Sequence, residues 1–165
     1  MPQTDNPLKV YFRQPALYIK LPSNGQYWPN GSLDMPPNNE LPVLPMTALD
    51  EIAYRTPDAL FNGQAVINVI QSCIPSIKNA WACPVTDINA ILTAIRIASY
   101  GHTLEIGTTC VSCGHEAEYG LDLRSVIDQI RSPDYSKSVV NGDLVVSFKP
   151  MTYRDQAATG KLQFD

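Results

Sequence analysis

Apolar residues recur with helical spacing most regularly between Asp87 and Tyr100. Isoleucine, leucine and alanine stand three and four positions apart there and cover more than one side of the predicted helix. Such a helix is expected to lie in the centre of the fold, because a surface helix carries a single apolar stripe. We expect Thr86 or Asp87 to cap its start and Gly101 to close its end.

Three further helices are predicted from the same periodicity and from cap and stop residues. The first begins after Thr47, whose side chain suits a helix N-terminus, and is expected to end at Pro57. The second begins near Asn62 or Gly63 and is expected to stop at Pro75. The third covers residues 123–131, where apolar residues again fall on one face.

Short strands and a tight turn complete this pattern. Residues 16–21 predict a strand, and residues 42–46 are expected to pair with it as an edge strand, since prolines flank that segment. Residues 139–146 predict a β-hairpin around Asn141 and Gly142. Asn-Gly supplies both positive-φ positions of a type I′ turn.

Cys110 and Cys113 form a C-x-x-C-G turn between two strand-like runs, residues 103–109 and 116–121. This is the shape of a zinc knuckle, a β-hairpin whose turn offers two sulfur ligands to one metal. Gly114 stands where the turn often needs a positive φ. A four-coordinate structural zinc needs two more ligands, so the pattern gives half of a site.

Three interpretations of this turn stay open. In the first, the two thiolates bind zinc with ligands from another copy, from another protein, or from Cys73, Cys83, His102 and His115. Cys83, in a loop, is a better third ligand than Cys73, which falls on an apolar helix face, and His115 is a further candidate. In the second, hydrogen bonds hold a metal-free turn. The third is a redox dithiol, which the flanking strands disfavour because such motifs usually begin a helix.

Together these elements predict an α+β fold with a single domain. It combines central apolar helices with short N-terminal strands and two C-terminal β-hairpins, one of them the zinc-knuckle-like C-x-x-C turn. At 165 residues the chain is long enough to bury a core of its own. We expect the domain to cover residues 16–150 and residues 1–15 to form a flexible tail. Residues 151–165 are polar and are expected to start a helix or fray.

Composition and charge limit the function classes. The net charge of −4 and the scattered lysines and arginines argue against a nucleic-acid binder that neutralises phosphates. No apolar run reaches the length of a membrane span, and residues 1–6 carry no signal peptide, so we expect residence in the cytoplasm. The chain contains neither a G-x-G-x-x-G nor a Walker pattern, and the context of His102 and His115 does not indicate a nucleophile. We therefore expect no catalytic residues and no cofactor other than zinc.

The first third of the chain combines prolines with aromatic residues. Most of the 14 prolines precede Thr47, which predicts an extended and irregular segment. Five aromatic side chains crowd into the same segment: Tyr11, Phe12, Tyr18, Tyr27 and Trp28. They are candidate partner-binding residues that anchor the segment on a neighbouring subunit, or they cover a sheet of their own domain. A homo-oligomer is one of the arrangements that stay open.

Five short boxes, in a fixed order, resemble one known family. Their residues are Leu21–Tyr27, Pro45–Glu51, Ile95–Gly101, Cys110–Gly114 and Leu121–Leu123. In this order they resemble the baseplate proteins of T-even-type tailed bacteriophages, the hub-assembly proteins of contractile tails. The resemblance covers about residues 17–154, which is most of the chain.

The resemblance implies a non-enzymatic virion-assembly protein that is made in the host cytoplasm and works in the tail baseplate. Its partners would be other phage tail and baseplate hub proteins, which it joins as a hub component or serves as an assembly chaperone. Members of the family continue beyond Asp155 into a longer C-terminal helical segment, so we expect a short or an incomplete member here. The alternative is a small zinc-binding structural module of unrelated function.

Overall fold

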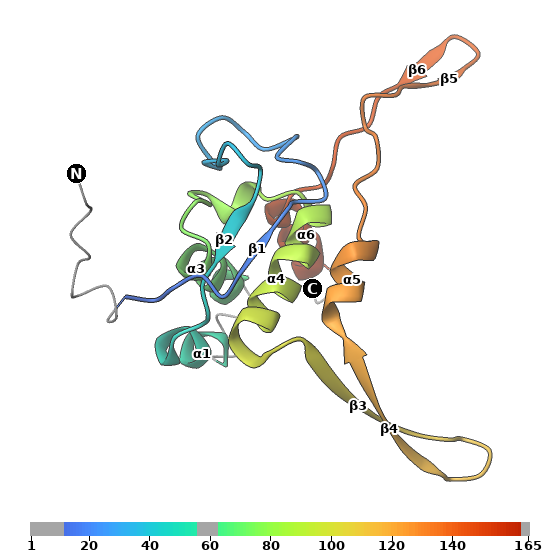
Figure 1. Cartoon of the computed structure of the whole chain (residues 1–165). Helices are drawn as coiled ribbons and strands as arrows, with labels where there is room; N and C mark the ends of the chain where they lie inside the picture. Colours follow the sequence, from blue (N-terminus) through green and yellow to red (C-terminus); the bar gives the residue numbers. More distant parts are fainter. Residues whose placement is uncertain (1–11, 56–62, 163–165) are drawn as a thin grey trace, which may run out of the picture.

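Helix α4 (Val85–Tyr100) runs through the centre of the molecule (Figure 1). The computed structural model describes residues 12–55 and 63–162. Helices and strands from both ends of the chain contact α4, and Ile88, Ile91 and Ile95 are buried against them. The prediction of a central helix that is packed on several sides is therefore confirmed.

The start of α4 differs from the prediction. The helix begins at Val85, and its N-cap residue is Pro84, whose side chain has no hydrogen-bond acceptor. Thr86 and Asp87 lie inside the first turn, so the capping role predicted for them is wrong. Asp87 is instead fully buried and accepts hydrogen bonds from the N-terminal segment. The predicted end is confirmed, because Gly101 closes the helix.

Helices α1 (Ala48–Tyr54) and α3 (Gln64–Cys73) pack against each other beside α4. Thr47 caps α1 in a reciprocal capping box with Asp50, which confirms the predicted cap. The stop predicted at Pro57 lies outside the described residues. Helix α3 buries the apolar face that its periodicity predicts.

Arg13 ties the segment before the first strand to these two helices. Its guanidinium donates to the carbonyl oxygens of Pro45 (2.9 Å) and Ser72 (2.8 Å). It also lies 3.5 Å from the carboxylate of Asp50, to which the Ser72 hydroxyl donates. Burial acts to raise the pKa of Asp50, but hydrogen bonds from Thr47 and Ser72 and the charge of Arg13 lower it overall.

Asp50→Asn is expected to lower the free energy of unfolding at neutral pH by about 1 kcal/mol, mostly through the capping box, since solvent screens the ion pair. The pKa of Asp50 is lower in the folded than in the unfolded state. Its contribution is therefore present above the ordinary aspartate pKa of about 3.9 and is lost as the pH falls through the folded value. Urea denaturation at neutral and acidic pH should show a difference between variant and wild type that shrinks in acid. A difference that does not change with pH would contradict this assignment.

Strands β1 (Leu17–Ile19) and β2 (Leu41–Val43) form a two-stranded antiparallel sheet. The predicted pairing is confirmed, but the second strand covers residues 41–43 and not 42–46. Tyr18 lies opposite Pro42, and the neighbouring pair of Ile19 with Leu41 is buried. The sheet therefore covers α4 with one face and presents Tyr18 on the other.

The C-terminal helix α6 (Tyr153–Leu162) returns to the core. Thr152 caps it by accepting a hydrogen bond at its side-chain oxygen from the backbone of the first turn. The ring of Tyr153 stacks on Trp81, with 5.7 Å between the ring centroids. Trp81 belongs to a short 3-10 helix, η2 (Ala80–Ala82), in the loop before α4. The C-terminal segment thus forms a helix, one of the two outcomes that the sequence left open.

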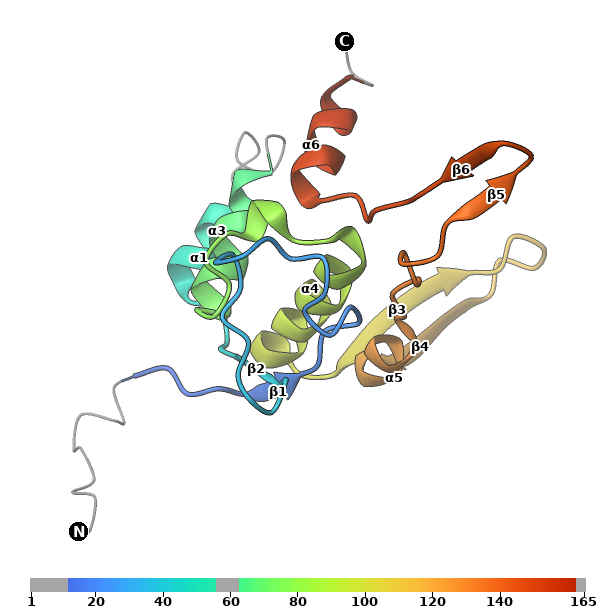
Figure 2. The same cartoon turned by 90° about the horizontal axis from the view of Figure 1, so that it is seen from above.

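Two β-hairpins project from the body on the side that carries α5 (Leu123–Gln129) (Figures 1 and 2). One consists of β3 (Thr103–Thr109) and β4 (Glu116–Asp122). The other consists of β5 (Val139–Asn141) and β6 (Leu144–Val146). The predicted α+β class, with N-terminal strands and two C-terminal hairpins, is confirmed. The zinc knuckle within it stays a prediction.

The turn of the β5–β6 hairpin differs from the predicted type. Asn141 belongs to β5 and pairs with Leu144, so Gly142 and Asp143 occupy the two central positions. Gly142 has a φ of +62°, whereas neither Asn141 nor Asp143 has a positive φ. A positive φ at the first central position alone is the pattern of a type II′ turn. The predicted hairpin is right and the predicted type I′ turn is wrong.

Candidate functional site

The β3–β4 hairpin, here called the cysteine arm (residues 103–122), has two different faces. Its strands pair without interruption from Thr103 opposite Asp122 to Thr109 opposite Glu116. Side chains alternate along a strand, and directly opposed residues share a face. One face therefore carries Leu104, Ile106, Thr108, Ala117, Tyr119 and Leu121. The other carries the acidic residues Glu105, Glu116, Glu118 and Asp122.

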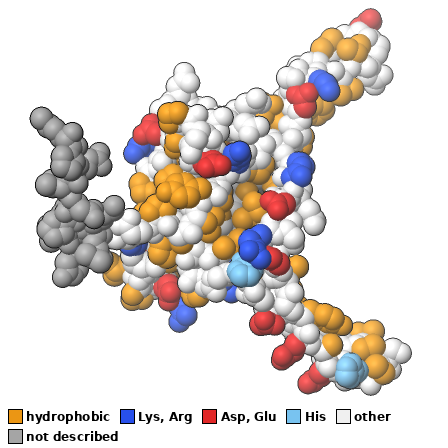
Figure 3. Space-filling model, in the orientation of Figure 1, with side chains coloured by type: hydrophobic (Ala, Val, Ile, Leu, Met, Phe, Trp, Pro, Cys, Tyr) orange, Lys and Arg blue, Asp and Glu red, His pale blue; other side chains and the backbone are white. Residues whose placement is uncertain are grey.

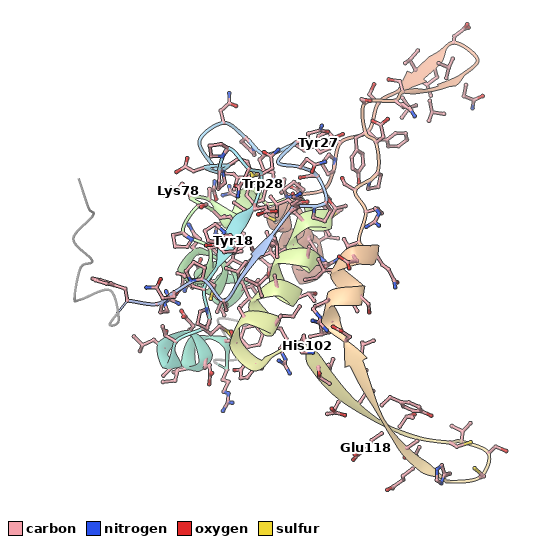
Figure 4. All side chains as sticks on the ribbon, in the orientation of Figure 1. Tyr18, Tyr27, Trp28, Lys78, His102 and Glu118 are labelled. Atoms are coloured by element: carbon pink, nitrogen blue, oxygen red, sulfur yellow. The ribbon has the colours of Figure 1, made fainter. Side chains whose placement is uncertain are left out.

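The apolar face of the cysteine arm is open to solvent. Tyr119 is 61% exposed, and Ile106 and Leu121 are also exposed. Figure 3 shows hydrophobic side chains along one edge of this arm and acidic ones along the other. In Figure 4, His102 lies where the arm leaves the body, and Glu118 lies further out. A two-stranded hairpin has little stability of its own in water, so this face is suited to a partner.

The tip of the cysteine arm holds Cys110 and Cys113, both exposed. The backbone N–H of Cys110 donates to the carbonyl of His115 (2.8 Å), and that of Gly114 donates to the carbonyl of Cys110 (2.9 Å). Gly114 has a φ of +70°, as predicted. Hydrogen bonds from the backbone of Cys113 and Ser112, and from the Cys113 thiol, lower the pKa of the Cys110 thiol. The tip is thus a turn between strands that favours a thiolate.

Of the other candidate ligands, only His115 borders this tip, where its carbonyl accepts from the Cys110 N–H. The remaining three lie elsewhere. Cys83 is fully buried, donates to the carbonyl of Pro84, and has its pKa raised by burial. Cys73 is also buried in the core, and His102 lies at the opposite end of the arm (Figure 4). Within residues 12–55 and 63–162, no group of three or more His, Cys, Asp or Glu side chains is placed to hold a metal ion. In a single copy the described residues thus provide two thiols at the tip and no complete site.

The β5–β6 hairpin, here called the valine arm (residues 139–146), is apolar on both faces. Val140 lies opposite Val145, and these side chains are 67% and 62% exposed. On the other face, Val139 and Leu144 are also exposed. Strands that are apolar on both faces are typical of a protein interior, whereas a hairpin on the surface usually has one polar face. Four of its six strand residues are thus apolar and exposed.

Trp28, one of the predicted partner-binding residues, is used inside its own domain. Its indole N–H donates to the Asp87 carboxylate (2.7 Å), and its ring packs against the core. The same carboxylate accepts hydrogen bonds from the backbone and the hydroxyl of Ser23. Burial raises the pKa of Asp87, and these hydrogen bonds oppose the rise. Asp87 therefore fastens the segment around Ser23 and Trp28 to the first turn of α4.

The other predicted aromatic residues are dispersed. The Tyr27 hydroxyl accepts a hydrogen bond from the backbone of Tyr135, and the two rings meet edge to face at 5.4 Å. Tyr18 and Phe12 are exposed, and Tyr11 lies outside the described residues. The described side chains thus make different contacts: Trp28 packs on the core, Tyr27 meets Tyr135, and Tyr18 is exposed on β1 (Figure 4).

Tyr18 belongs to the wall of an open groove of about 770 Å³ between β1 and α5. Apolar side chains from three elements line it, among them Leu17, Ile97 and Ile127. Charged residues of both signs stand at the same groove: Lys20, Glu40, Arg124, Asp128 and Arg131. This mixture suits a polypeptide better than a small apolar molecule, since pockets for such molecules are mostly apolar and enclosed.

Comparison with known protein families identifies a match. A family model described as T4 bacteriophage base plate protein matches residues 43–164. The matched range contains α4, both arms and the C-terminal helix. Neither a curated protein nor a solved structure matches the chain.

Proposed function

The chain belongs to the T4 bacteriophage base plate protein family, and from this premise we propose that it helps to build the central hub of the tail baseplate. Family membership implies contacts with other baseplate proteins. The sequence boxes resemble proteins of the hub, which is why we place the protein in that part of the baseplate. It would act there either as a component of the hub or as a chaperone for its assembly. In either role the protein acts through protein–protein contacts and without catalysis, in the host cytoplasm during assembly.

The exposed valine arm is the observation that carries this proposal. Four large apolar side chains, Val139, Val140, Leu144 and Val145, stand more than half exposed on one short hairpin. Monomeric proteins rarely expose such a patch unless it is a site of interaction. The apolar face of the cysteine arm adds a second surface on the same side of the body (Figures 1 and 2). None of the described helices combines the length and the hydropathy that crossing a bilayer requires.

Recovery of partners from infected cells tests the proposal. A tagged chain is expressed in the host during phage infection and purified after gentle lysis, and the proteins that accompany it are identified. We expect baseplate hub proteins in the purified sample. Finished virions are then probed for the chain: its presence indicates a hub component, and its absence indicates a chaperone. If no baseplate protein is recovered from the lysate, the hub role is wrong.

A further inference from the structure

We propose that the tip of the cysteine arm is one half of a zinc site, and that a second copy of this chain completes it. Each copy would contribute the Cys110 and Cys113 sulfurs to one shared ion. A structural zinc takes four ligands in a tetrahedron, and four thiolates are a common set. The ion would join two copies of the protein at the ends of their cysteine arms.

The first argument is the local geometry of the tip. The hydrogen bond from Gly114 N–H to the Cys110 carbonyl and the positive φ of Gly114 close a tight turn, which holds both cysteines on one loop. Both cysteines are exposed on this loop at the end of the arm, and two thiolates on one such turn are half of a four-cysteine zinc site.

The second argument is that the chain offers no other sulfur to this tip. Its four cysteines and two histidines all lie within the described residues. Cys73 and Cys83 are fully buried in the core. The described residues contain no group of three or more potential ligands. A thiolate site with four ligands at Cys110 and Cys113 therefore needs sulfurs from outside this copy.

The third argument is the position of the tip. Seven residue pairs separate the turn from the body, so two tips can meet end to end while the two bodies stay apart (Figure 1). A second copy supplies the two missing sulfurs in the same turn geometry. On binding, each cysteine loses its Sγ–H proton to solvent and gains an Sγ–Zn bond, with no change in oxidation state.

Zinc titration of the purified chain tests this inference. The protein is kept reduced, Zn²⁺ is added, and mass in solution and bound zinc are measured on the same sample. We expect about one zinc for two chains and a dimer that a chelator returns to monomers. The double variant Cys110→Ser with Cys113→Ser should stay monomeric and bind no zinc. Ser112→Ala, which lies between the two ligands and leaves both thiols in place, should behave like the wild type.

Other outcomes overturn the inference. One zinc bound to a monomer would mean that the chain supplies all its protein ligands itself, and loss of that zinc in His115→Ala would identify the third. No binding by the wild type, or binding only in a complex with the thiols of another phage protein, would exclude the shared site. The titration uses the purified chain alone, so its failure leaves the recovery of baseplate proteins, and with it the hub role, untouched.

Discussion

Replacing Asp87 with alanine is expected to lower the free energy of unfolding by about 3–5 kcal/mol. The carboxylate is fully buried and accepts from three donors: the backbone and hydroxyl of Ser23 and the indole of Trp28. Each buried donor that loses its partner costs about 1–3 kcal/mol. For a chain of this length the midpoint of thermal unfolding should fall by roughly 6–20 °C. Urea denaturation followed by circular dichroism measures the loss.

Matched variants separate this role from a general effect on α4. Asn89→Ala changes an exposed position of the same helix and should alter stability by about 0.5 kcal/mol or less. Trp28→Phe keeps most of the ring but removes the N–H donor, and it should be less costly in the Asp87→Ala background than in the wild type. If Asp87→Ala costs no more than Asn89→Ala, the buried hydrogen bonds do not hold the N-terminal segment.

The double variant Val140→Glu with Val145→Glu is expected to weaken binding to baseplate partners by roughly 100-fold or more. Burying one valine side chain is worth about 1.5–3 kcal/mol, so two of them account for at least about two powers of ten. The two residues are directly opposed, and a pair of carboxylates there cannot enter an apolar interface without a large cost. The folded body should be unaffected, because both side chains are mostly exposed.

The control for this variant is Lys137→Glu, just outside the valine arm. It changes the net charge by the same two units, at an exposed side chain that forms a surface ion pair with Asp134. Surface ion pairs of this kind contribute about 0–1 kcal/mol, so the control should bind and fold like the wild type. Unchanged recovery of baseplate proteins by the double variant would exclude the valine arm as a binding surface.

The sequence predicts the local elements well because they depend on local chemistry. Helical periodicity gives α4, the Thr47 cap gives α1, and the glycines at 114 and 142 give the two hairpin turns. The error in turn type comes from a shift of one residue: Asn141 pairs in the strand, and the cross-strand register decides which residues form the centre of the turn.

The role of Asp87 was not predictable from local pattern. An aspartate at the start of a helix has the same appearance in sequence whether it caps the helix or is buried in it. Ser23, which decides between the two, lies 64 positions away. The contact of Trp28 was not predictable either, because its indole N–H and the Asp87 carboxylate come together only in the folded chain. Such long-range polar contacts carry no periodicity that a single sequence reveals.

The exposure of the two arms was also missed, although the valine arm contains a usable signal. Its strands lack the alternation of apolar and polar residues that a half-buried hairpin shows, with Val139 beside Val140 and Val145 beside Val146. That pattern indicates burial on both faces. It does not indicate whether the residues that bury the two faces belong to the same chain or to a partner. The structure shows the arm projecting from the body (Figure 1).

Photo-crosslinking from the valine arm during infection tests the central claim most directly. A photoreactive amino acid replaces Val145 on the arm, and in a separate variant it replaces Asn38, an exposed residue of the loop before β2. We expect Val145 to crosslink to a baseplate protein and Asn38 to give no such product. The absence of baseplate products at Val145, or equal crosslinking from both positions, would contradict the claim that this protein assembles the baseplate through its projecting arms.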